Sequence, residues 1–192
     1  PSLENVKIDK KTGDYKLDDL AVAMQKANLY GDMVVSYKKF AYGLPTLLFC
    51  VDVNHSKEVC AAFNKAGVQA EHVDALMPDK NRNEVIARLE KGETKVITNV
   101  GIFTTGVDIP CIQCIILARP TKSYNLYIQI LGRGTRTYPG KEKFYVLDHA
   151  DCIAEHGFIE REKKCSLTGE TPNAKPFITT CRVCYHVWDP YE

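Results

Sequence analysis

The chain has 192 residues, of which 45% are hydrophobic and 26% are charged. This balance is usual for a folded globular protein and argues against a disordered chain. The 25 Lys and Arg residues nearly cancel the 24 Asp and Glu residues and leave a net charge of +1, so overall attraction cannot drive binding to nucleic acid. The length allows one domain with an appendage and is too short for two ordinary domains.

The sequence gives no sign of a membrane or secreted protein. No apolar run approaches the roughly 20 residues that a bilayer-spanning helix needs, and PSLENVKIDK lacks the apolar centre of a signal peptide. We therefore expect a cytoplasmic protein without a membrane partner. The eight cysteines favour free thiols, with at most one metal site, because Cys50, Cys60 and Cys114 stand in apolar periodic stretches.

The first part of the chain predicts a linker followed by two helices. Residues 1–16 have no apolar period, which indicates an extended linker from a lobe upstream. From Leu17 to Tyr42 apolar residues recur at helical spacing, and Gly31 divides this stretch into two predicted helices.

Short apolar runs then alternate with amphipathic segments. The predicted strands are 46–53, 68–75, 95–100, 112–119 and 143–150. Asn54 can cap a helix that runs to Gly67, and Asp79 opens another that ends at Gly92. Strands separated by helices imply right-handed crossovers and a parallel sheet covered on both faces. We therefore predict a three-layer α/β domain over residues 17–150.

Residues 151–192 form a separate, small C-terminal tail of charged and polar sequence. Cys181 and Cys184 have the spacing of a zinc knuckle, which makes them candidate metal ligands. One knuckle supplies only two ligands. The others would come from His186, Cys165, Cys152, His156 or a second cysteine pair beyond residue 192. An ordinary pair of thiols is the alternative.

Polar residues gather after the third predicted strand, in TNVGIFTTGVDIP (98–110). Ligands of open parallel sheets bind outside the carboxyl ends of the strands. Thr98 and Asn99 offer a hydroxyl and an amide there, and a hydroxyl suits a phosphate. Gly106 permits a close backbone approach, and Asp108 is a carboxylate held before a rigid Ile-Pro step, which suits a ribose hydroxyl.

A second candidate site is QILGRGTR (129–136), which carries Arg133 and Arg136 behind two glycines. Guanidinium groups bind phosphate through two parallel hydrogen bonds and stay charged at every working pH. The two residues therefore predict an anion clamp. A pair of solvated arginines that close a helix is the alternative that this segment alone leaves open.

Three segments, in this order, resemble motifs IV, V and VI of the second RecA-like lobe of superfamily 2 helicases. They are TLLFCVDVNHS (46–56), NRNEVIARLEKGETKVITNVGIFTTGVDIP (81–110) and RPTKSYNLYIQILGRGTR (119–136). The resemblance covers roughly residues 5–150 and is to the DEAD/DEAH type of phages and bacteria, with restriction-enzyme motor subunits close by. It implies a RecA-like fold of the P-loop NTPase type.

This resemblance implies roles for the residues of the last motif. Arg133 and Arg136 match the arginines that the family points at the γ-phosphate of ATP, and Gln129 matches the residue that opens the motif. We also predict that Gly132 contributes to binding the nucleotide cofactor. Ile130 stands where DEAD-box RNA helicases have Arg, which argues against a strict DEAD-box protein.

The other motifs contribute nucleotide and nucleic-acid positions by the same resemblance. Gly106 and Asp108 match positions near the nucleotide ribose and the lobe interface. Thr98 and Asn99 match positions near the nucleic-acid backbone. Weaker candidates for phosphate contact follow motif IV, namely Asn54, His55 and Ser56.

A helicase also needs a P-loop, GxxxxGK[ST], and an acidic motif that holds magnesium. GTRTYPGKE (134–142) has one residue too many between its glycines, and FYVLDHAD (144–151) is typical of a last sheet strand, so we interpret both as structural. The resemblance then implies ATP and Mg²⁺ held mainly by an N-terminal lobe of the same parent chain, with DNA or RNA as the other partner.

We therefore expect the C-terminal motor domain of an ATP-dependent helicase or translocase, inactive as an isolated fragment. One alternative is the motor portion of a type I or III restriction enzyme. Another, from a different class, is a non-catalytic nucleic-acid-binding module with a zinc tail.

Overall fold

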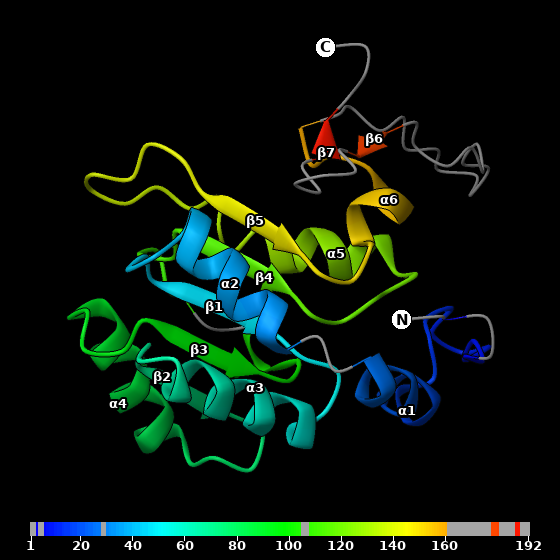
Figure 1. Ribbon diagram of the computed structural model, residues 1–192, viewed down its shortest axis with the longest axis horizontal. Helices are drawn as coiled ribbons and strands as arrows, with labels where there is room; N and C mark the ends of the chain where they lie inside the picture. The colour runs from blue at the N-terminus through cyan, green and yellow to red at the C-terminus, as the bar shows by residue number, and fades with distance from the viewer. Residues whose placement is uncertain are drawn as a thin grey trace.

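A computed structural model describes residues 3, 6–27, 30–104, 108–160, 178–180 and 187–188. Its centre is a five-stranded parallel sheet with the order β2-β3-β1-β4-β5 (Figure 1). The strands are β1 (Thr46–Phe49), β2 (Ala70–Val73), β3 (Val96–Asn99), β4 (Cys114–Leu117) and β5 (Tyr145–Asp148). The prediction of a parallel α/β domain is confirmed.

Each strand is shorter than its predicted range, and at the end of β1 the reason is that buried apolar residues continue beyond the hydrogen-bonded ladder. Cys50 and Val51, for example, are buried although they follow the end of β1. Apolar pattern alone reports burial and does not separate a strand from the buried loop that leaves it.

Helices connect the strands and cover both faces of the sheet. They are α1 (Leu17–Ala27), α2 (Tyr30–Phe40), α3 (Val53–Lys65), α4 (Asp79–Glu90), α5 (Tyr124–Leu131) and α6 (Cys152–His156), with a 3₁₀ turn η1 (Ile102–Thr104) after β3. The side chains of α2 and α3 pack into one hydrophobic cluster, and those of α4 and α5 pack into another. The expected three layers are therefore present.

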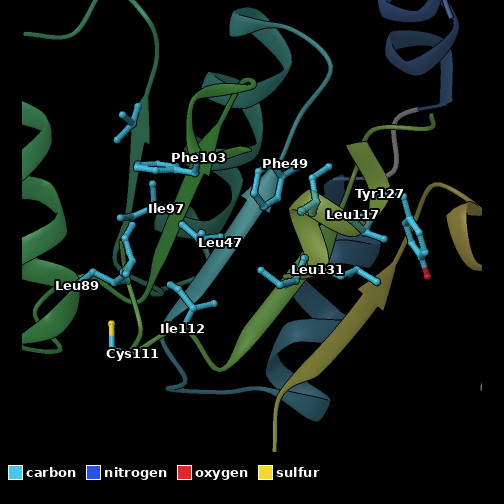
Figure 2. Close-up of a cluster of buried hydrophobic side chains, with 14 of the residues drawn as sticks. Leu47, Phe49, Leu89, Ile97, Phe103, Cys111, Ile112, Leu117, Tyr127 and Leu131 are labelled. Atoms are coloured by element: carbon cyan, nitrogen blue, oxygen red, sulfur yellow. The ribbon is translucent and has the colours of Figure 1, made fainter. Parts of the chain in front are cut away.

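Successive side chains of a strand point to opposite faces of the sheet and so contribute to both clusters. Leu47 and Phe49 of β1 join the cluster beneath α4 and α5, while Leu48 between them joins the cluster beneath α2 and α3. Figure 2 shows the first cluster, in which Tyr127 and Leu131 of α5 lie over the sheet. Burial on both faces explains why the central strands β1 and β4 are almost continuously apolar.

Two helix starts differ from the sequence expectation. α3 begins at Val53 because the carboxylate of Asp52 accepts a hydrogen bond from His55 N at 2.8 Å and caps the helix. Asn54 is therefore inside the helix and is not its cap. Gly31 lies in the first turn of α2 and does not separate the two predicted helices.

The segment before α1, expected as an extended linker, is docked on the domain. Ile8 and Tyr15 form an antiparallel bridge, which folds the segment back on itself. Asp14 next to this bridge is buried, and its carboxylate accepts hydrogen bonds from Lys122 N at 2.7 Å and Thr121 Oγ1 at 2.8 Å. The docking point is the loop between β4 and α5.

The packed unit also continues past the expected boundary at residue 150. Cys152 belongs to the core cluster beneath α5, and the Tyr127 hydroxyl donates to Gly157 O at 2.8 Å. The ring of His156 stacks on that of Tyr127 with 4.9 Å between centroids. α6 is thus part of the domain.

The last described elements are β6 (Thr179–Thr180) and β7 (Val187–Trp188), which pair antiparallel. Cys181 and Cys184 lie outside the described residues, so the zinc prediction stays a prediction. Within the described ranges, no helix has both the length and the apolar character to cross a membrane.

Candidate nucleotide and nucleic-acid sites

The arginine segment is positioned by α5. The hydroxyl of Ser123 accepts a hydrogen bond from Leu126 N at 3.3 Å and caps this helix just after the loop that leaves β4. As a crossover helix, α5 runs antiparallel to the strands. Tyr127 lies near the carboxyl end of β5, and Leu131 lies closer to its amino end (Figure 2). The segment that follows α5 therefore reaches the opposite edge of the sheet.

Gly134 fixes the place where this segment meets the sheet. A Cβ atom there would lie only 2.5 Å from Cδ2 of Phe144, the residue just before β5. No side chain fits in that space, which explains the second glycine of QILGRGTR. The arginines are thus held near the amino end of β5, away from the carboxyl edge on which the sequence interpretation concentrated.

Arg133, Arg136 and Asp108 come together in the structure. Arg136 Nη1 donates a hydrogen bond to Asp108 Oδ1 and forms an ion pair with it. Arg133 is 9% exposed, and burial lowers the pKa of its guanidinium, with Arg136 lowering it further and Asp108 raising it. Arginine stays protonated under such shifts, so the cluster brings two guanidinium cations close together beside the Asp108 carboxylate.

A third cation approaches this cluster from the loop before β5. Lys141 Nζ donates to Arg136 O at 2.8 Å, and burial lowers the pKa of this amine. The grouping of these cations suits the phosphates of a nucleotide.

The remaining predicted nucleotide residues lie around α5. Gln129 is exposed near the end of the helix. Gly132 is the C-terminal cap residue, and a Cβ atom there would lie 3.0 Å from Ile128 O. Gly106 lies outside the described residues.

The residues predicted to bind nucleic acid are buried. Thr98 and Asn99 at the end of β3 are both 0% exposed. Thr98 Oγ1 donates to Ser56 O at 3.0 Å, and Asn99 Nδ2 donates to Leu48 O at 3.0 Å. These hydrogen bonds tie β3 to α3 and β1. The amide oxygen of Asn99 is buried with no hydrogen-bond partner among the described residues.

His55 and Ser56 in the first turn of α3 are also buried. Val51 N donates to His55 Nδ1 at 3.4 Å, and burial lowers the pKa of this imidazole, which favours its neutral form. Ser56 Oγ is 2.7 Å from His72 Nδ1. These side chains, like that of Thr98, make hydrogen bonds inside the lobe, and their contact with a nucleic-acid strand stays a prediction.

The described residues contain no group of three or more His, Cys, Asp or Glu side chains that would hold a metal ion. The cysteines in this part of the chain are free thiols, as predicted. Burial raises the pKa of Cys111 to about 11 and that of Cys114 to about 12, so both thiols stay protonated at neutral pH.

Residues 25–138 match the model of the helicase conserved C-terminal domain. A Lactococcus phage 51.5 kDa protein is 33% identical over 157 residues, which are 82% of this chain and 34% of the relative. IRC3, an ATP-dependent helicase candidate of Saccharomyces cerevisiae, is 36% identical over 138 residues, or 70% of this chain and 20% of the relative. The EcoKI type I restriction endonuclease subunit of Escherichia coli is 38% identical over 121 residues, which are 55% of this chain and 10% of the relative.

Solved structures show the same fold. The C-terminal domain of the DEAD-box protein Dbp5 has a TM-score of 0.55 at 13% identity, covering 66% of this chain and 75% of that one. The E. coli DEAD-box protein SrmB has a TM-score of 0.53 at 21% identity, covering 62% and 68%. The chain spans about a third or less of the relatives matched by sequence. Because the family match covers more than half of it, this chain belongs to the helicase conserved C-terminal domain family of superfamily 2, with its RecA-like fold.

Proposed function

We propose that this chain is the C-terminal motor lobe of an ATP-dependent nucleic-acid helicase or translocase, and that Arg133 and Arg136 act on an ATP bound by a second lobe. The cluster of Arg133, Arg136 and Asp108 carries this proposal. Two guanidinium groups held close together can bind an anion through several parallel hydrogen bonds, so the cluster is suited to a phosphate.

Asp108 would hold Arg136 ready until the lobes close. Its carboxylate is 76% exposed on the side-chain scale, so the ion pair is screened by solvent and breaks at small cost when a phosphate approaches. The side chain of Asp108 is then available to a ribose hydroxyl. Gln129, exposed near the end of α5 that leads to the two arginines, would orient the reacting water or the phosphate.

ATP and Mg²⁺, when bound by the other lobe, would supply the phosphoryl group that water attacks. The part of this chain is to neutralise the charge that builds up on the phosphoryl oxygens. Arginines in this role are worth about 10³ to 10⁵ in rate, or about 4 to 7 kcal/mol.

A nucleic-acid partner is proposed from the family and from the carboxyl edge of the sheet, where ligands of parallel sheets bind. Domain 2 of the DEAD-box protein Mss116p, which shares the fold with a TM-score of 0.51 at 18% identity, is bound to an RNA duplex. The relative from the EcoKI restriction enzyme supports a second candidate, the motor portion of a restriction system. Cytoplasmic location and zinc binding by Cys181 and Cys184 remain predictions.

The test is ATP hydrolysis by the full-length parent protein, with and without single-stranded DNA or RNA. We expect nucleic acid to stimulate turnover, and Arg133→Ala or Arg136→Ala to lower kcat by at least about 10³ while the circular dichroism spectrum stays unchanged. Arg88→Ala is the matched control, because Arg88 binds Glu71 on another part of the domain. Normal turnover in Arg136→Ala would refute the arginine roles.

A further inference from the structure

The buried carboxylate of Asp14 joins two parts of the chain that lie far apart in the sequence. Asp14 precedes α1 and is 7% exposed, whereas its partners lie in the loop between β4 and α5. Its Oδ1 accepts a hydrogen bond from Lys122 N at 2.7 Å, and its Oδ2 accepts one from Thr121 Oγ1 at 2.8 Å. Arg119 Nη2, at 3.4 Å from Oδ2, balances the charge. A buried carboxylate is costly unless it is paired and hydrogen-bonded, so these partners hold Asp14 in one place.

The segment that carries Asp14 is itself folded. Asp9 N donates to Asp14 O at 2.8 Å, next to the antiparallel bridge between Ile8 and Tyr15. Lys122 Nζ lies 5.7 Å from the centre of the Tyr15 ring, which adds a second contact to the same loop. Figure 1 shows this segment, in dark blue, on the side of the domain where α5 begins. Because the segment is folded and attached at two points, a displacement of it acts directly on the loop.

The loop partners of Asp14 determine where α5 begins. Thr121 Oγ1, which donates to Asp14, accepts a hydrogen bond from Ser123 N at 3.0 Å. Ser123 is the residue whose hydroxyl caps α5 by accepting from Leu126 N. Thr121 O accepts a further hydrogen bond from His156 Nε2 at 2.9 Å, which ties α6 to the same loop. The start of α5 is thus connected to Asp14 through a single hydroxyl group.

The helix α5 extends this connection to the arginine segment. It has eight residues and is too short to be stable by itself, so its contacts fix its place. Arg133 N donates to Ile130 O at 3.1 Å, and Gly134 N donates to Leu131 O at 2.8 Å. The last turn of the helix therefore holds the segment that follows it. A shift of α5 along its axis would move Arg133 with it.

We infer that Asp14 is a positioning residue for ATP hydrolysis, because it joins the segment that enters the domain to the start of α5 and so sets where α5 holds Arg133 and Arg136. The inference rests on the proposed function, and it gives the segment expected to come from the other lobe a part in the reaction. Asp14 is buried and acts only through the two arginines. A misplacement of about 1 Å can cost about 100-fold in rate, so the loss of Asp14 should lower kcat by at least about tenfold.

The experiment measures kcat and KM for ATP, at saturating nucleic acid, of the full-length wild type, Asp14→Ala, Arg136→Ala and the double variant. Each is assayed well below its Tm, so that it stays folded. We expect Asp14→Ala to lower kcat by at least about tenfold with KM within a few-fold of the wild type. In the Arg136→Ala background the same substitution should change kcat by less than about twofold, because residues that act as a unit lose their effect together. Asp18→Ala, at an exposed carboxylate of α1, is the matched control and should turn over ATP as the wild type does.

Thr121→Val takes the place of Asp14→Ala if that variant does not fold, because it removes the hydroxyl that donates to Asp14 and nearly keeps the shape of the side chain. A wild-type kcat in the variant that is assayed would refute the role of Asp14. An equal fall in kcat with and without Arg136 would refute it as well, because the loss would then come from a general weakening of the fold. If Arg136→Ala itself keeps normal turnover, the proposed function fails and the inference fails with it.

Discussion

Substituting Gly134, between the two arginines, tests how the arginine segment is seated. An added Cβ atom would lie 2.5 Å from Cδ2, 2.8 Å from Cε2 and 3.1 Å from Cγ of Phe144. Real Cβ atoms do not approach a ring this closely, so either Phe144 or the segment from Arg133 to Arg136 must move. We therefore expect Gly134→Ala to disturb both stability and the arginine cluster.

Overpacking of this kind costs about 1 to 3 kcal/mol, and 1 kcal/mol corresponds to about 2 to 4 °C in Tm for a domain of this size. We expect Gly134→Ala to lower Tm by about 2 to 12 °C in a thermal melt followed by circular dichroism. Phe144→Leu, which removes the obstructing ring, should recover part of the loss when it is combined with Gly134→Ala. The four proteins form a double-mutant cycle with a coupling energy of about 0.5 kcal/mol or more.

Strict additivity in this cycle would refute the reasoning, because it would mean that Gly134 and Phe144 do not compete for one space. The same result would remove the evidence that the arginines lie at the amino end of β5. An unchanged Tm for Gly134→Ala alone would do so as well.

Three further predictions concern the docked ends of the domain. Asp14→Ala removes the buried hydrogen-bond acceptor for the loop after β4 and the carboxylate that pairs with Arg119. The free energy of unfolding, measured in urea, should therefore fall by about 3 kcal/mol. A loss no larger than that of the control Asp18→Ala, at an exposed carboxylate, would contradict this prediction. Tyr127→Phe removes the hydrogen bond to Gly157 O and should cost about 1 kcal/mol in the same assay, whereas a neutral result would mean that this bond does not hold α6. Burial raises the pKa of Asp148, so the stability linked to its titration is present below its ordinary pKa and is lost as the pH rises through the folded pKa. Relative to the wild type, Asp148→Asn should therefore gain stability as the pH rises from the ordinary carboxyl pKa through the raised pKa of the folded state, and a difference that is constant with pH would count against this burial effect.

The fold was predictable because its signal is local. The three central strands β1, β3 and β4 are buried along their whole length, and short apolar runs between amphipathic segments indicate that arrangement directly. Helix starts were less predictable, since the choice between Asp52 and Asn54 as the cap of α3 depends on one side-chain hydrogen bond.

The candidate sites were only partly predictable because they depend on which way a side chain points. The resemblance to helicase motifs selected Arg133, Arg136 and Asp108, which the structure brings together. It also selected Thr98 and Ser56, whose hydroxyls suit phosphate in principle. Their hydrogen bonds run inward, and a motif does not reveal that direction.

The central claim is that Arg136 acts on the transition state of ATP hydrolysis in the full-length protein. The most direct measurement is kcat and KM for ATP, at saturating nucleic acid, of the wild type and Arg136→Lys, which keeps the charge and loses the planar fork. We expect kcat to fall by at least about 100-fold with KM within a few-fold of the wild type, because the lost contact forms only in the transition state. An unchanged kcat, or an effect confined to KM, would contradict that role.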